Sequence, residues 1–100
     1  MRFGLHENII TDIQHVFSSV PEVSEVILYG SRAKGNYKPG SDIDLVIDGA
    51  KPNLALLNKI SFLLDDLYLP YTFDLSILGH IDNSDLLEHI KRVGVSLYKK

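Results

Sequence analysis

The segment from Asp42 to Asp48 alternates carboxylates with aliphatic side chains, and this pattern constrains the fold more than any other feature. Successive side chains of a β-strand point to opposite faces, so a period of two predicts a strand with one polar and one apolar face. Asp42 and Asp44 then share a face, with their Cα atoms roughly 6–7 Å apart. Because aspartate is depleted in strands and the two charges repel, the pair indicates a functional site.

The rest of the chain predicts an alternation of helices and strands. We expect helices over residues 5–20, 52–69 and 82–92 and strands over residues 23–29, 42–48, 71–78 and 95–98. Pro52 falls near the first turn of the second helix, and Asn83 or Ser84 is the expected N-cap of the last one. The fold class is therefore α/β (α+β), with one small mixed sheet of three to four strands flanked by helices in a single domain, residues 1–100.

Composition excludes several classes of protein. A net charge of −3 does not favour a broad grip on long nucleic acid, which needs many Lys and Arg contacts to phosphate. There is no cysteine, so disulfides and thiolate metal sites are excluded. The N-terminus lacks the apolar run of a signal peptide, and the apolar stretch 54–69 is interrupted by polar residues. We expect a cytoplasmic protein without a membrane span.

A Gly-Ser pair follows the first predicted strand directly. Gly30 permits a sharp bend and a close approach of ligand to backbone. If Ser31 opens a helical turn, its N–H groups and hydroxyl can bind a phosphate. Arg32 and Lys34 add positive charge to the same loop, and we count both as candidate phosphate ligands, whereas Lys38 has the weaker case.

A third carboxylate, Asp74, lies in the middle of the predicted strand 71–78. Oxygen ligands in this number suit Mg²⁺, and two ions about 3.5–4 Å apart can clamp the attacking and leaving oxygens of a phosphoryl displacement. Asp74 could bind one metal and take the proton of an acceptor hydroxyl. The four histidines show no metal-ligand spacing, and we interpret them as structural or solvated. Tyr37 either stacks on a base or covers apolar surface.

Gly30-Ser31 followed after ten residues by Asp42-x-Asp44 resembles the signature of the DNA polymerase beta nucleotidyltransferase superfamily. The stretch GSRAKGNYKPGSDIDLVI is most similar to the minimal nucleotidyltransferases (MNT) encoded beside HEPN-domain proteins. The resemblance runs from about Val26 through Asp74 to the tail at Gly94–Tyr98, which covers nearly the whole chain. An Asp-x-Asp or a Gly-Ser alone would be weak evidence, but the combination is specific.

The resemblance implies a polymerase-beta-like palm and a role for each matching residue. Gly30 and Ser31 would bind the triphosphate of ATP, with Lys34 at a usually basic position. Asp42 and Asp44 would hold both Mg²⁺ ions, and Asp74 matches the third carboxylate. Relatives paired with HEPN toxins act as antitoxins by attaching AMP to a tyrosine of the toxin. The implied partner is a HEPN-domain toxin encoded nearby, in a homo- or hetero-oligomer.

Two other functions stay open on the sequence. The chain could neutralise its partner by binding alone, because the apolar helix 54–69 has more apolar positions than a core needs. It could instead transfer nucleotides to a small molecule or an RNA end. The retained carboxylates argue against the first alternative, and the negative net charge makes long nucleic acid an unfavourable substrate for the second.

Overall fold

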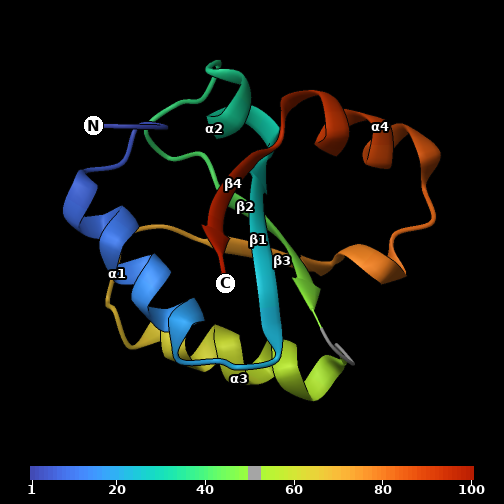
Figure 1. The fold of residues 1–100 in the computed structure, drawn as a ribbon. Helices are drawn as coiled ribbons and strands as arrows, with labels where there is room; N and C mark the ends of the chain where they lie inside the picture. The colour runs from blue at the N-terminus through green and yellow to red at the C-terminus, as the bar shows by residue number, and fades with distance from the viewer. Residues whose placement is uncertain (50–52) are drawn as a thin grey trace.

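The computed structural model describes residues 1–49 and 53–100, and within them four strands form one mixed sheet in the order β3-β2-β1-β4 (Figure 1). The inner strand β2 runs parallel to β3 and antiparallel to β1, the other inner strand, and β4 is antiparallel to β1. The elements in chain order are α1 Glu7–Ser18, β1 Val23–Tyr29, α2 Gly30–Lys34, β2 Ile43–Gly49, α3 Leu54–Asp65, β3 Phe73–Ile77, the 3₁₀-helix η1 Leu78–His80, α4 Ser84–Val93 and β4 Val95–Lys99.

The sheet and its helices confirm the predicted fold class. Strand β1 has the predicted bounds, and Asn83 is the N-cap of α4, where its side chain accepts from the amides of Asp85 and Leu86 at 2.9 and 3.1 Å. The expected helical turn after β1 is also present, as the short helix α2. The expectation for Pro52 lies outside the described residues.

Helix α3 ends at Asp65 and not near Leu69 as predicted. Two physical features shorten it. Asp65 and Asp66 place negative charge at the carboxyl end of the helix, where the macrodipole disfavours it. Tyr68 adopts a left-handed backbone conformation with φ of 53°, which cannot continue a right-handed helix.

Successive side chains of β2 point to opposite faces of the sheet, and each face packs against a different set of residues. Ile43, Leu45 and Ile47 are buried on one face, against the amphipathic helices α1 and α3. The other buried members of this main core come mainly from β1, β4 and both helices; they include Ile10, Ile13, Phe17, Val26, Leu28, Leu56, Ile60 and Leu64. Removing this apolar surface from water is the main source of stability of the sheet.

The opposite face of the sheet carries the polar residues of β2 and is covered in part by α4. Val46 packs there with Tyr29 and Ile90 in a second, smaller apolar cluster. Figure 1 shows α2 and α4 near the same end of the sheet, where β1 ends. The short helix α2, the helix α4 and the start of β2 therefore lie together at this end. Within the described residues, no helix is both long and apolar enough to cross a bilayer.

Candidate active site

Asp44 and Asp74 are direct partners in the parallel register of β2 with β3. Residues opposite each other on neighbouring strands point to the same face, so the two carboxylates lie side by side on the face shared with α4. Asp42 lies two residues before Asp44, just ahead of the start of β2, and is exposed. The structure thus pairs Asp44 with Asp74 on one sheet face, and Asp42 lies close enough for its charge to act on Asp44.

The surroundings of Asp44 show that these carboxylates share one electrostatic environment. Partial burial raises the pKa of Asp44, and the negative charges of Asp74 and Asp42 raise it further. His89 and Arg32 act in the opposite direction but do not cancel the rise. The surroundings of Asp44 therefore disfavour its ionised form, and a bound cation would relieve this.

Gly30 begins the turn that follows β1, and its backbone lies against Asp44. Its φ is +73°, a conformation that favours glycine. A Cβ atom built at this position would collide with Oδ2 of Asp44. Ser31, half-buried, follows in the first turn of α2. The predicted phosphate-binding turn is therefore in direct contact with one of the predicted metal ligands, Asp44.

Arg32 lies in a different place from the one expected of a phosphate ligand. Its side chain is 1% exposed, and its guanidinium donates to the carbonyl oxygens of Phe3 at 2.9 Å, Ser41 at 2.9 and 3.1 Å, and Pro39 at 3.3 Å. The guanidinium carbon also lies 4.9 Å from the ring centroid of Tyr71. With its donors used in this way, Arg32 holds the segment between α2 and β2 in place, and we leave it out of the proposed nucleotide ligands.

The other basic residues of the loop, Lys34 and Lys38, are exposed. Lys34 is the last residue of α2, and Gly35 follows it in a left-handed conformation. Tyr37 is 37% exposed, with its ring centroid 5.4 Å from the guanidinium carbon of Arg32. Tyr37 therefore packs on the guanidinium of Arg32, and Lys34 and Lys38 are the loop cations whose side chains are exposed.

His89, which the sequence analysis interpreted as structural or solvated, lies beside the turn. Its Nε2 accepts a hydrogen bond from the amide of Gly30 at 3.2 Å. Its half-buried ring also meets the ring of Tyr29 edge-on, with centroids 6.2 Å apart. The available sequence signal was its position next to Leu86 and Ile90 in the helical period of α4, which predicts an inward-facing side chain but not its partner.

Tyr29 lies next to both the turn and the carboxylates. It is the antiparallel partner of Asp44 in the sheet and is 7% exposed. Burial raises the pKa of its hydroxyl, and so do the charges of Asp74 and Asp44, whereas the nearby polar side chain of Ser76 lowers it. The phenol is therefore neutral at ordinary pH, and it is a buried, uncharged side chain beside the two carboxylates.

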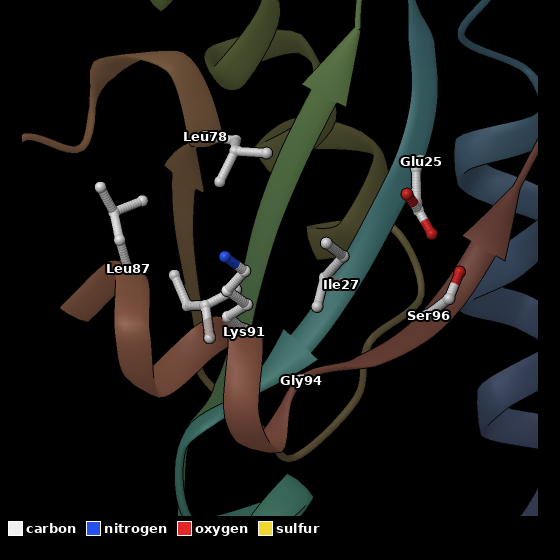
Figure 2. A pocket seen from close by; sticks show the side chains of 8 residues that line it. Glu25, Ile27, Leu78, Leu87, Lys91, Gly94 and Ser96 are labelled. Atoms are coloured by element: carbon white, nitrogen blue, oxygen red, sulfur yellow. The ribbon is translucent and has the colours of Figure 1, made fainter. Parts of the chain in front are cut away.

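A groove of about 560 Å³ lies between α4 and the sheet, and Figure 2 shows it from close by. Its lining residues are Glu25, Ile27, Leu78, Leu87, Ile90, Lys91, Gly94 and Ser96. The floor is apolar and two opposite charges, Glu25 and Lys91, stand among the lining residues. None of the three carboxylates contributes to it, so the groove is separate from the candidate active site.

The donors at the carboxylate end suit a hard cation, but they do not form a closed cage. Among residues 1–49 and 53–100, no group of three or more His, Asp or Glu side chains is arranged to hold a metal ion. Mg²⁺ commonly uses one or two carboxylates and completes its six ligands with water and substrate phosphates. The adjacent pair Asp44 and Asp74, with Asp42 nearby, fits that mode of binding.

This arrangement of fold and site defines the class of protein. A family model described as polymerase beta, nucleotidyltransferase matches residues 11–100. The chain belongs to this nucleotidyltransferase family. No curated protein sequence matches it.

Solved structures share the fold at low sequence identity. A toxin–antitoxin structure with AMP-PNP aligns with a TM-score of 0.69 and 24% identity, over 96% of this chain and 75% of that one. A tri-AMPylated HEPN toxin of Shewanella oneidensis in complex with MNT antitoxin gives 0.68 and 19%, over 96% and 74%. A nucleotidyltransferase from Sulfolobus solfataricus gives 0.59 and 20%, over 94% and 79%. These similarities show the polymerase-beta-like fold.

Proposed function

We propose that this chain transfers a nucleoside monophosphate, AMP from ATP, to a hydroxyl group of a partner protein. The observation that carries the proposal is the adjacency of Asp44 and Asp74 next to the turn at Gly30. Phosphoryl transfer depends mainly on positioning and on neutralising charge, and this end of the sheet offers parts suited to both. Membership of the nucleotidyltransferase family supports the same reaction class.

Two Mg²⁺ ions are the proposed cofactor. Asp42 and Asp44 would hold them together with Asp74, and the phosphates of the nucleotide would complete the ligand set. When bound, the metal supplies charge neutralisation for the phosphoryl oxygens and the leaving group. The raised pKa of Asp44 supports this proposal, because a cation would relieve the repulsion that Asp74 and Asp42 impose on it.

The chain's own residues would act on the nucleotide and the acceptor in distinct ways. Gly30 allows the phosphates to approach the backbone, and the Ser31 hydroxyl donates to a phosphate oxygen. Lys34, exposed at the end of α2, adds positive charge to the triphosphate. Asp74, exposed on the edge strand β3, takes the proton from the acceptor hydroxyl as that oxygen attacks the α-phosphorus and pyrophosphate departs.

The proposed acceptor is a tyrosine of a HEPN-type toxin, which makes the chain an antitoxin. Two observations support this choice of partner. The MNT resemblance covers the segment that carries the site, and one of the similar structures is an AMPylated HEPN toxin with MNT antitoxin. Modification of the toxin would silence it, and the two proteins would form a hetero-oligomer.

Mass spectrometry of the partner tests this function. The chain is mixed with ATP, Mg²⁺ and the HEPN protein encoded beside it, and the partner's mass is followed for the addition of adenylate. Wild type should produce the adduct, and Asp42→Ala/Asp44→Ala should reduce the rate about a thousandfold or more, since metal binding contributes several kcal/mol to such a transition state. Asp48→Asn is the matched control, because Asp48 lies exposed on the same strand. The proposal fails if the wild type forms no adduct or if the double variant matches it.

A second candidate function is neutralisation by binding alone. The observation that favours it is apolar surface on and after α3, where Phe62 is 70% and Tyr68 is 89% exposed. Phe62→Ser should leave folding unchanged and weaken the complex with the partner. If the double Asp variant still neutralises the toxin while Phe62→Ser does not, binding is the active function. A transferase for a small molecule or an RNA end would instead consume ATP with that acceptor in the absence of the partner.

A further inference from the structure

We infer that His89 is a positioning residue that anchors the nucleotide-binding turn through the amide of Gly30. The inference rests on the proposed function and adds a residue to its site. His89 lies on α4, far along the chain from the turn, and its Nε2 accepts from the Gly30 amide at 3.2 Å. The helix thus reaches the turn by a side-chain contact that the sheet does not provide.

Gly30 needs such an anchor because its backbone is intrinsically permissive. Glycine populates many backbone conformations, and its left-handed φ of +73° brings it against the Asp44 carboxylate with no side chain to fix it. The hydrogen bond from its amide to His89 restricts this freedom. If the acceptor is removed, the half-buried amide loses its partner and the turn can change its distance from the carboxylates.

The same bond changes the role expected of Gly30. Its amide is directed to Nε2 of His89, so it is not the donor that meets the triphosphate. Gly30 contributes shape, and the hydroxyl and amide of Ser31 become the phosphate contacts of the turn. The ring of His89 is itself held edge-on by Tyr29, the sheet partner of Asp44. A closed path of contacts therefore runs from Asp44 through Gly30 and His89 to Tyr29.

Two substitutions separate the hydrogen bond from the packing of the ring. His89→Gln keeps an acceptor at similar reach and removes the aromatic ring, whereas His89→Phe keeps a ring against Tyr29 and removes the acceptor. Glu88→Gln is the control, since Glu88 is the exposed neighbour on α4. Each variant is examined as the full chain, first by circular dichroism for folding and then by hydrogen exchange of the Gly30 amide and by calorimetry with ATP and Mg²⁺.

We expect His89→Phe to lose protection of the Gly30 amide and to bind ATP about 5- to 30-fold more weakly, the effect of one lost buried hydrogen bond. His89→Gln should keep most of both properties. The inference is overturned if His89→Phe matches wild type in both measurements, because packing of the ring would then be enough. It is also overturned if His89→Gln loses as much as His89→Phe, because a hydrogen-bond acceptor at this position would then not hold the turn. If wild type binds no ATP, the proposed function fails, while the exchange pattern still decides whether His89 anchors the turn.

Discussion

Asp44 and Asp74 lie side by side across the parallel pair of β2 and β3, although they belong to distant parts of the sequence. Like charges in direct register are destabilising in a sheet. This local conflict, the repulsion between the two carboxylates, lies at the end of the sheet where Gly30 contacts Asp44 and His89 binds Gly30. The conflict has consequences for catalysis, stability and nucleotide binding, each of which can be measured.

Replacing Asp74 should separate nucleotide binding from transfer. Asp74→Asn removes the proposed proton acceptor and keeps the shape of the side chain on β3. We expect ATP affinity to fall much less than the transfer rate, because Asp42 and Asp44 still bind the metal, and the rate to fall by about 10²- to 10⁴-fold, the usual contribution of a general base. Single-turnover kinetics with saturating ATP measures the rate, and calorimetry measures the affinity. A variant that transfers at the wild-type rate would show that Asp74 takes no part in the proton transfer.

Asp44 should lower stability where it is ionised, and the effect should depend on pH. Its pKa in the folded protein lies above the ordinary value of 3.8, so the folded state binds more protons than the unfolded state between the two values. Stability contributed by this group is therefore present below the unfolded pKa and is lost as pH rises through the folded pKa. In metal-free buffer, Asp44→Asn should melt at a higher temperature than wild type at neutral pH.

The pH series provides the internal control for Asp44→Asn. The gain in melting temperature should shrink as pH falls below the unfolded value, where wild-type Asp44 is itself protonated. Added Mg²⁺ should stabilise wild type more than the variant. A gain that is equal at low and neutral pH would mean that charge repulsion is not its cause.

Substitutions of Arg32 and Lys34, which both lie in the turn, should have different effects: the first should lower stability and the second should weaken ATP binding. Arg32→Lys replaces a fork that reaches three carbonyl oxygens by a single ammonium group, and should cost about 1–3 kcal/mol of unfolding free energy. Lys34→Met alters an exposed side chain and should change stability by less than about 0.5 kcal/mol, while it weakens ATP binding. Urea denaturation and calorimetry measure the two effects. Equal losses of stability would contradict the assignment.

Gly30 and Gly35 offer a matched pair for the contact with Asp44. Both have positive φ, +73° and +94°, so alanine should cost about 1–3 kcal/mol at either position. A Cβ at Gly30 would also collide with the Asp44 carboxylate, whereas a Cβ at Gly35 meets no atom within 4 Å. Gly30→Ala should therefore abolish transfer, and Gly35→Ala should retain it once temperature is adjusted for the lost stability. Equal retention of activity would disprove the importance of the contact.

Local patterns in the sequence determined most of the secondary structure and the list of candidate carboxylates. The period of two in β2, the β-branched run of β1 and the amphipathic helices each depend on neighbours within a few residues. The predicted end of α3 was wrong because the left-handed backbone of Tyr68 stops the helix, and the sequence has no glycine at this position to indicate it. Such conformations are fixed by packing around the residue and not by its type.

Tertiary structure decided which residues meet. The register that pairs Asp44 with Asp74, the burial of Arg32 under Tyr71 and the reach of His89 to Gly30 all join segments distant in sequence. An arginine in a polar loop and a histidine on a helix can each bind many different partners. From residue type alone, Arg32 was therefore predicted to bind phosphate and His89 was assigned no role in the site. Only the packing of α4 and of the loop against the sheet selects one partner, because a buried donor or acceptor must be satisfied by whatever the fold brings within reach.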